Sequence, residues 1–526
     1  MIPVQGGACG QAGFLPLYAN RSVQYRYTFP YHLDYWPGRT AMTVTLASES
    51  AAGWRPVRQA DATLVAQLAD DVARRIDDQG LRPGTRLPSI RKMAEQAGVS
   101  RFTVVEAYDR LVARGLVQSR RGAGFFVRAR RGPLAAAARA ASAGDIAAPP
   151  ARIDVAWLLR NMFREPEASA MPGGAGLLPA DWLDPGMVSA AVRAVGRAVR
   201  GHLVAYGSPL GYAPLRQQLA SRLQADGVPA HPDHNLLTTN GVTHGLDLVA
   251  RHLVRPGDAV LVEDPAWFVI FGRLAAFGAR LIGVPRGPDG PDLEQLDRLA
   301  ALHKPRLFII NGAVHNPTGH TLSAGAAYDI LRLAERHDFL VVEDDTYGEL
   351  HPGGAMKLAS LDRLNRVILA GGFSKMLAAS LRVGYLAANA ELLQKLADLK
   401  MLAGLTTPEL GERVVHRVLV EGQYRRHIER VRARVNVARQ QCLSALVGLG
   451  LAVPHEPHAG MFVWADCGRD SESLARTAVD HGLLLAPGSL FSPSQAPSTM
   501  MRFSVSMVDT PGIWQAVARV LAAPGN

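Results

Sequence analysis

The sequence predicts an α/β protein with a small helical domain that carries a β-hairpin, followed by a large domain with a mainly parallel sheet. Three observations support this prediction. The chain has 526 residues, which is more than one hydrophobic core normally holds. Residues 58–130 show helical spacing, helix caps and a glycine turn. Residues 154–526 contain apolar, strand-like runs that end in polar residues, as in open α/β sheets.

The composition is typical of a globular protein, with 48% hydrophobic and 20% charged residues. No run of about 18 apolar residues predicts a transmembrane helix. The first residues lack the basic stretch and apolar core of a secretion signal. The three cysteines (Cys9, Cys442 and Cys467) have no metal-like spacing, so we expect no metal site and a reducing, cytoplasmic environment.

The net charge of +11 suits a polyanionic partner. An alternative explanation is a general arginine bias, because the chain has 51 arginines and only six lysines. The position of the charge is more informative than its sum. Seven arginines fall within residues 110–131, at the end of the small predicted domain.

Residues 1–57 form an N-terminal extension that is aromatic and irregular, with no clear periodicity. Two explanations stay open: the segment is disordered, or translation starts at Met42 and the upstream residues come from a gene-start error. The mass of the native protein would decide between them.

The first predicted helix begins near Ala62 and ends before Pro83-Gly84. Its apolar side chains recur at every fourth position: Leu64, Leu68, Val72 and Ile76. Ser89 would cap a second helix over Ile90–Ala97, and Ser100 would cap a third. Three apolar side chains would form the inner face of the third helix: Val104, Tyr108 and Leu111. Residues 116–127 then predict a two-stranded hairpin around a glycine turn.

Three helices followed by a hairpin form the layout of a winged helix-turn-helix. Over residues 81–127 the sequence LRPGTRLPSIRKMAEQAGVSRFTVVEAYDRLVARGLVQSRRGAGFFV resembles the GntR family nearly throughout. The matching residues are Leu87-Pro88-Ser89, Arg91, Val99-Ser100-Arg101, Thr103-Val104, Ala107-Tyr108, Leu111 and Gly115-Leu116. The resemblance implies binding to double-stranded DNA, with the third helix as the recognition helix.

The same resemblance assigns the DNA contacts to Ser89, Arg91, Arg101, Thr103, Arg121 and Gly122. Each of these side chains taken alone would be an ordinary solvated surface residue, and only the ordered set favours DNA binding. Phe102 departs from the polar residue usual at its position. It would either read a thymine methyl by apolar contact or pack inward.

Residues 131–153 are rich in alanine and contain glycine and proline, so we interpret them as a linker. The large domain, residues 154–526, follows. In it four predicted strands end in polar residues: Gly241-Val242-Thr243 leading into a helix, Asn316-Pro317-Thr318-Gly319, Asp344 with Tyr347, and Ser374-Lys375. A lysine at the mouth of a buried strand is desolvated, which lowers its pKa as a Schiff-base lysine requires.

This ordered series resembles the fold type I aminotransferases, which use pyridoxal phosphate, over roughly residues 175–524. The resemblance implies that Lys375 binds the cofactor's aldehyde. It also implies that Asp344 holds the pyridine nitrogen, with Asp345 as the competitor for this position. Asn316 and Tyr347 would flank the phenolic oxygen.

The resemblance further implies a phosphate site, a stacking aromatic and a carboxylate clamp. The phosphate contacts would be Gly241, Val242, Thr243, Ser374 and Arg382. Trp267 would stack on the pyridine ring, and Tyr206 would reach the partner subunit's phosphate, which implies a homodimer. Arg502, placed at the end of a late strand, would hold the α-carboxylate of an amino-acid ligand.

Two departures from the family pattern affect the phosphate site. Gly372 stands where relatives usually have Ser or Thr, so one hydroxyl is missing. Ala379-Ser380 stand where relatives often have Pro-Gly. Neither change removes a residue that the chemistry requires.

A GntR-like domain joined to an aminotransferase-like domain resembles the MocR family of transcriptional regulators. The resemblance implies a pyridoxal-phosphate-dependent, DNA-binding regulator that senses an amino acid or amine through aldimine exchange at Lys375. Two alternatives remain open. One is a catalytically active aminotransferase that carries a DNA-binding domain. The other is a regulator whose large domain no longer binds the cofactor, against which the intact Lys375, Asp344 and Asn316 argue.

Overall fold

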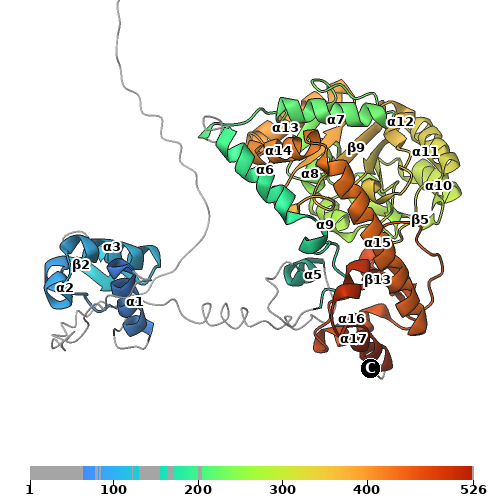
Figure 1. Ribbon diagram of the computed structural model, residues 1–526. Coiled ribbons are helices and arrows are strands. Elements are labelled where there is room, and N and C mark those ends of the chain that lie inside the picture. The colour runs from blue at the N-terminus through green and yellow to red at the C-terminus, as the bar shows by residue number, and fades with distance from the viewer. Residues whose placement is uncertain are drawn as a thin grey trace, which may run out of the picture. The chain divides into compact units, whose positions relative to one another are not determined.

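The computed structural model describes residues 63–77, 81, 84–120, 123–128, 155–162, 171–198 and 204–523. The chain divides into two compact units, one within residues 1–132 and the other within residues 133–526 (Figure 1). The predicted N-terminal extension (1–57) and linker (131–153) lie outside the described residues. Among the described residues, no helix combines the length and apolarity needed to cross a membrane.

The small unit contains the predicted three helices and hairpin. These elements are α1 (Leu64–Asp77), α2 (Ile90–Ala97), α3 (Arg101–Ala113), β1 (Val117–Arg120) and β2 (Gly124–Val127). Both predicted caps are confirmed. The Ser89 side chain accepts a hydrogen bond from the Lys92 amide at 3.3 Å, and the Ser100 side chain accepts one from the Thr103 amide at 3.0 Å.

The inner face of α3 forms the core of the small unit. Val104, Tyr108 and Leu111 are fully buried, as the apolar spacing predicts. The Tyr108 hydroxyl donates to the Pro88 carbonyl at 3.0 Å, and its ring meets Phe125 of β2 edge-on at 4.9 Å. This packing fixes the recognition helix against the hairpin.

The large unit is built on an eight-stranded sheet in the order β3-β10-β9-β8-β7-β4-β5-β6. In that order the strands are β3 (Leu236–Thr239), β10 (Gly384–Ala387), β9 (Val367–Gly372), β8 (Leu340–Asp344), β7 (Leu307–Ile310), β4 (Ala259–Asp264), β5 (Arg280–Gly287) and β6 (Gly290–Pro291). β10 is antiparallel to both β3 and β9, and β6 is antiparallel to β5. The other neighbours are parallel. The carboxyl ends of the parallel strands therefore share one edge, where ligands of such sheets bind.

Helices surround this sheet (Figure 1). They are α5 (Val155–Met162), α6 (Pro185–Ala198), α7 (Ala213–Ala225), α8 (Val242–Leu253), α9 (Phe268–Ala276), α10 (Leu293–His303), α11 (Ala324–His337), α12 (Leu358–Asp362), α13 (Ala390–Gly404) and α14 (Glu409–Val420). Short 3-10 helices are η1 (Ala180–Trp182), η3 (Gly348–Leu350) and η4 (Ala379–Leu381). Apart from β5, whose burial is partial, the strands of the sheet are almost fully buried, which explains their continuous apolar sequences.

A long helix connects the sheet to a C-terminal part of the same unit. α15 (Gln423–Gly448) has 26 residues, begins after Gly422 in a left-handed conformation (φ 74°), and packs against strand β11. Figure 1 shows it running from the sheet to the C-terminal elements. These are β11 (Phe462–Asp466), α16 (Ser471–Asp480), β12 (Ala486–Pro487), η5 (Gly488–Phe491), β13 (Met500–Ser504), η6 (Val505–Asp509) and α17 (Ile513–Ala522). The strands form an antiparallel sheet in the order β11-β13-β12.

Two predicted details of these strands are wrong. β3 ends at Thr239 and does not continue through Gly241, because Gly241 has a φ of 75° that an extended strand does not allow. Arg502 does not end a strand. It lies inside β13, paired with Trp464 of β11.

Candidate functional site

Lys375 follows β9 at the carboxyl edge of the sheet. Its Nζ donates a hydrogen bond to the Gly176 carbonyl at 2.9 Å. Burial, together with the positive charges of Arg502 and Arg382, lowers the pKa of this amine to about 8, although the charge of Asp344 opposes the shift. A substantial fraction of the amine is therefore neutral near pH 8, and the neutral form is the nucleophile.

Asp344 is the last residue of β8 and is buried. Burial raises the pKa of its carboxyl to about 6, although hydrogen bonds from Thr346 and the charge of Lys375 lower it. The Thr346 amide donates to Asp344 Oδ1 at 3.0 Å. Asp345, the competitor for this role, forms an ion pair with Lys357 Nζ at 2.7 Å. Because Asp345 already has a partner, the geometry favours Asp344 as the carboxylate that faces a ligand.

Asn316 and Tyr347 lie side by side in the buried part of the site. Asn316 Nδ2 donates to the Tyr347 hydroxyl at 3.4 Å. The Asn316 amide donates to Asn311 Oδ1 at 2.8 Å, which fixes the loop that follows β7. Burial raises the pKa of Tyr347 above its ordinary value, so its hydroxyl keeps its proton and can donate a hydrogen bond.

The start of α8 faces a cationic side chain. Arg382 donates to Ser374 Oγ at 3.2 Å and to the Asn240 carbonyl at 3.0 Å. A Cβ at Gly241 would lie 2.6 Å from Arg382 Nη2 and would displace this side chain, and the φ of 75° favours glycine at this position. Val242 and Thr243 begin the helix, and first-turn amides have no partner within a helix. Free amides, hydroxyls and a guanidinium together suit a phosphate.

Gly372, which replaces the usual hydroxyl residue, ends β9 beside this helix start. A Cβ at Gly372 would lie 3.1 Å from Val242 Cγ2 and 3.4 Å from the Val383 carbonyl oxygen. The backbone around it is therefore packed closely enough that glycine fits best. The hydroxyls of Thr243 and Ser374 remain available, and both residues are half-buried.

Arg502 crosses from β13 into the site and is 2% exposed. Its Nη1 donates to Asn316 Oδ1 at 2.9 Å and its Nη2 to the Gly174 carbonyl at 2.6 Å. Its guanidinium lies over the rings of Phe462 and Phe491, at 4.2 and 4.9 Å from their centroids. Burial lowers the pKa of Arg502 to about 10. No carboxylate among the described residues forms an ion pair with it, so within that part of the chain its charge is uncompensated.

Two further predicted residues lie at the border of the site. Trp267 follows β4 as the residue before α9, and it is half-buried against the core. Tyr206 is 82% exposed, so it does not enter the buried site of its own chain. Its contact with a partner subunit stays a prediction.

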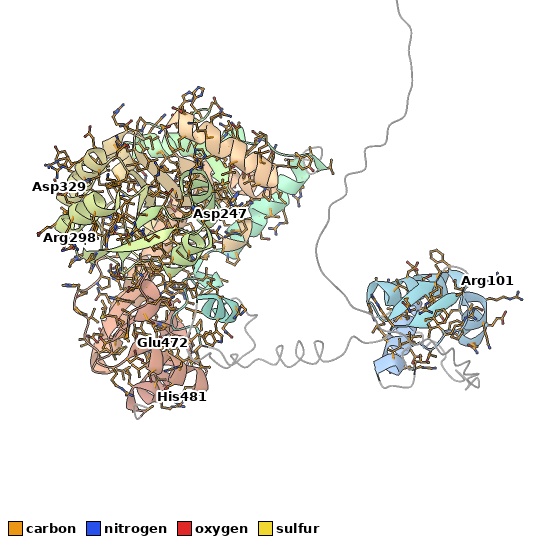
Figure 2. All side chains as sticks on the ribbon, turned by 180° about the vertical axis from the view of Figure 1, so that it is seen from behind. Arg101, Asp247, Arg298, Asp329, Glu472 and His481 are labelled. Atoms are coloured by element: carbon orange, nitrogen blue, oxygen red, sulfur yellow. The ribbon has the colours of Figure 1, made fainter. Side chains whose placement is uncertain are left out.

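The predicted DNA-contacting residues lie on the surface of the small unit. Arg91 is exposed and pairs with Glu95 at 3.2 Å. Arg101, the first residue of α3, is exposed, and Figure 2 shows its side chain extending away from the unit. The Thr103 hydroxyl lies 2.8 Å from Ser100 Oγ. Phe102 is 71% exposed, which excludes the inward-packing alternative. Arg121 and Gly122 lie outside the described residues.

Sequence reasoning missed three groups that hold the site residues in place. The Gly174 and Gly176 carbonyls accept from Arg502 and Lys375. Asn311 donates its side-chain amide to the Asp344 carbonyl at 2.6 Å and binds the Asn316 amide. The glycine-rich run at 173–176 and the asparagine at the end of β7 were visible, but no local pattern shows which distant residue each one meets.

These groups match the four needs of pyridoxal phosphate. An amine of lowered pKa, a buried carboxylate, a hydroxyl beside an amide, and a helix start with a cation stand at successive strand ends. A Cβ at Gly241 would fill the space beside Arg382, and the guanidinium of Arg502 lacks a carboxylate. The fold and site therefore define a pyridoxal-phosphate-dependent protein of fold type I.

Two family models match the chain. Residues 174–520 match "Aminotransferase class I and II", and residues 64–127 match "Bacterial regulatory proteins, gntR family". A 2-aminoadipate transaminase of Thermus thermophilus is 34% identical over 69% of this chain and 92% of its own length. The probable rhizopine catabolism regulatory protein MocR of Rhizobium meliloti is 30% identical over 82% of this chain and 87% of its own length.

Solved structures agree with these matches. The α-aminoadipate aminotransferase of Thermus thermophilus has a TM-score of 0.63 and 30% identity, over 72% of this chain and 95% of that one. The kynurenine aminotransferase of Pyrococcus horikoshii has a TM-score of 0.64 and 26% identity, over 70% and 93%. The chain thus belongs to the aminotransferase class I and II family, and its gntR-family domain makes it a MocR-type, pyridoxal-phosphate-dependent DNA-binding regulator.

Proposed function

We propose that the protein regulates transcription in response to a small amino compound, and that an amino acid is the preferred effector. The supporting observation is Arg502, a buried guanidinium whose hydrogen-bond partners among the described residues are an amide oxygen and a carbonyl oxygen. A carboxylate would accept two charge-assisted hydrogen bonds from the same nitrogens. The charge of Arg502 also lowers the pKa of Lys375, and the two side chains bind neighbouring carbonyls, those of Gly174 and Gly176.

Each site residue has a defined task in this proposal. When bound, pyridoxal phosphate supplies an aldehyde that exchanges one amine for another. Lys375 would provide the resident amine, and Asp344 would keep a proton on the pyridine nitrogen. The start of α8 with Arg382 would hold the phosphate. Trp267 would stack on the pyridine ring and so fix the orientation of its plane. Arg502 would orient the effector by binding its carboxylate.

The small unit would transmit the response to DNA. Arg91, Arg101 and Thr103 would contact the operator, with the wing residues Arg121 and Gly122 beside them. The effector must bind two states of the protein with different affinities, because otherwise it shifts no equilibrium. A homodimer would place two small units on one operator, with Tyr206 completing the partner's phosphate site.

The experiment that tests this proposal compares Arg502→Ala with the wild type. The variant should keep the cofactor absorbance but lose at least a hundredfold in amino-acid affinity, since a charge-assisted pair in a desolvated site is lost. The effect of the amino acid on DNA binding should disappear with it. An unchanged response would mean that Arg502 does not hold the effector. Titration with the corresponding decarboxylated amine would then show whether the effector has a carboxylate at all.

The second candidate function is a working aminotransferase with a DNA-binding domain. It is supported by the 34% identity with a 2-aminoadipate transaminase over nearly that enzyme's whole length. Lys375, Asp344 and Arg502 would serve catalysis as well as sensing. Steady turnover with a panel of amino acids and keto acids would support this candidate, and a single half-reaction without turnover would support the regulator.

A further inference from the structure

Phe102 is the second residue of the recognition helix α3, and none of the roles proposed above uses it. Its side chain is 71% exposed. Every other phenylalanine in the described part of the chain is buried or half-buried. Single exposed apolar residues are common on protein surfaces, so the position of Phe102 on the helix is more informative than its exposure.

Phe102 lies on the side of α3 that faces away from the core of the small unit. From Phe102 to Leu111 the helix makes about two and a half turns, which places these two side chains on opposite sides. Leu111 and Val104 are fully buried. Val105, which follows Phe102 on the same side, is 38% exposed. The outer side of the helix start therefore carries an apolar pair.

The hydrogen bonds of the cap fix Phe102 at the amino-terminal end of α3. Ser100 Oγ accepts from the Thr103 amide at 3.0 Å and lies 2.8 Å from the Thr103 hydroxyl. Phe102 stands between these two residues, so its backbone is held in place. The Cα–Cβ bond of a helical residue tilts toward the amino terminus, so the ring is directed toward the helix end. This is the end of a recognition helix that meets base edges in the major groove.

An aromatic ring placed against base edges favours one kind of base. The Phe102 side chain has no hydrogen-bond donor or acceptor. Against the polar edges of guanine, cytosine or adenine it would displace water without replacing the hydrogen bonds that the water made. Thymine presents an apolar group in the major groove, its 5-methyl group, and contact with this methyl has no such cost.

We propose that Phe102 is a specificity-determining residue that reads the 5-methyl group of a thymine in the major groove of the operator. The inference deepens the DNA-binding part of the proposed function and rests on it. It does not depend on the effector or on Arg502. Val105 would pack beside the ring against the same methyl group. In the proposed homodimer each half-site would carry one such thymine.

The test uses the full-length protein with pyridoxal phosphate and a library of random-sequence DNA duplexes, from which the wild type selects its binding sites. In a selected duplex each thymine in turn is replaced by uracil, which lacks only the 5-methyl group. Fluorescence anisotropy should show a thymine in each half-site whose replacement weakens wild-type binding about fourfold, as expected for one methyl group left in water.

Three variants assign this effect to a side chain. Phe102→Ser should weaken binding by a similar factor, and at that one position it should bind thymine and uracil equally. Phe102→Leu keeps an apolar side chain and should still distinguish them. Val112→Ser changes an exposed apolar residue near the other end of α3, and it should bind and distinguish the two duplexes like the wild type. Thermal unfolding should be the same for all of these proteins, because the changed side chains are exposed.

The proposal is overturned if wild-type binding is unaffected by every uracil replacement, or if Phe102→Ser stays as sensitive as the wild type at each position. It is also overturned if Phe102→Ser changes the number of subunits bound per duplex, because the ring would then contact a second copy of the chain. If the wild type enriches no sequence at all, sequence-specific DNA binding itself is contradicted, and this inference with it.

Discussion

The arginines proposed to contact DNA and two buried arginines of the large unit present positive charge in opposite ways. On the small unit, Arg91 and Arg101 are exposed, and the one ion pair of Arg91 is at the surface. In the large unit, Arg286 and Arg502 have almost no exposed surface, and neither has all its nitrogens satisfied. Exposed charges are well hydrated and strongly screened by salt, whereas buried charges are neither.

This difference follows from the two kinds of partner. A DNA backbone is a dense line of negative charge, and Lys and Arg side chains bind it with release of counterions. These side chains must therefore be exposed at the protein surface. A small ligand offers one or two charges, and a desolvated guanidinium binds them more strongly than an exposed one does. We therefore expect substitutions in the large unit to abolish a response, and substitutions in the small unit to weaken binding by graded, salt-dependent amounts.

The largest expected effect is that of Lys375→Ala. The variant should lose covalent attachment of pyridoxal phosphate completely, because no other described lysine has its amine at the strand edge beside Asp344. Borohydride treatment followed by mass spectrometry of peptides measures this attachment. Lys395→Ala, at an exposed lysine paired with Glu391, is the matched control and should keep full labelling. Labelling that persists in Lys375→Ala would contradict the assigned site.

The next effect is the pH dependence of cofactor attachment. With the pKa of Lys375 lowered from 10.5 to about 8, the neutral amine at pH 7 is roughly three hundred times more abundant than for a free lysine. The attachment rate of added pyridoxal phosphate should rise about tenfold per pH unit below pH 8 and level off above it. Stopped-flow absorbance measures this rate. A rate that still rises between pH 9 and 10 would show that the amine is not desolvated.

Arg101→Ala should have a smaller, graded effect on the other unit. Losing a base contact costs about 1–3 kcal/mol of DNA-binding free energy. Fluorescence anisotropy with operator DNA measures the loss, and the cofactor spectrum should stay unchanged. Arg298→Ala is the matched control, because it removes an arginine that is also exposed, but from the large unit (Figure 2).

The salt dependence of the same variant sharpens the assignment of Arg101. If Arg101 contacts a base, the slope of log affinity against log salt stays the same while sequence discrimination falls. If Arg101 contacts a phosphate, the magnitude of this slope falls by about 1 in the variant, and the preference for operator DNA over other sequences is unchanged. Equal losses for Arg101→Ala and Arg298→Ala would show only a general charge effect and would remove Arg101 from the recognition surface.

The smallest expected effect is that of Ser100→Ala. It removes the cap whose side chain accepts from the Thr103 amide at 3.0 Å, and it should lower the local stability of α3 by about 1 kcal/mol. Hydrogen exchange of the full-length protein should show faster exchange at the start of α3. Exchange in the sheet of the large unit should not change, since the two units have separate cores.

Local features were predictable from the sequence because local chemistry determines them. The bounds of α2, the caps at Ser89 and Ser100, and the inner face of α3 all follow from spacing and cap residues. The strand ends that carry Asp344 and Lys375 were predictable for a similar reason, since buried parallel strands give continuous apolar runs.

Long-range features of the site were not predictable. Arg502 meets the Gly174 carbonyl across a sequence separation of 328 residues, and no periodicity indicates such a contact. The unsatisfied edge of Arg286 is also invisible in the sequence, where this residue is one of many arginines. The choice between Asp344 and Asp345 rested on a resemblance until the ion pair between Asp345 and Lys357 was seen.

The length of α15 has a mechanical consequence. At 1.5 Å per residue its 26 residues span about 39 Å, so any tilt of the helix about Gly422 as a pivot would be amplified at the far end. A tilt of about 5° at the pivot would displace the far end by about 3 Å. That displacement is as long as the hydrogen bond between Arg502 and Asn316. A tilt of this size would therefore be large enough to separate two hydrogen-bonded groups at the far end of the helix.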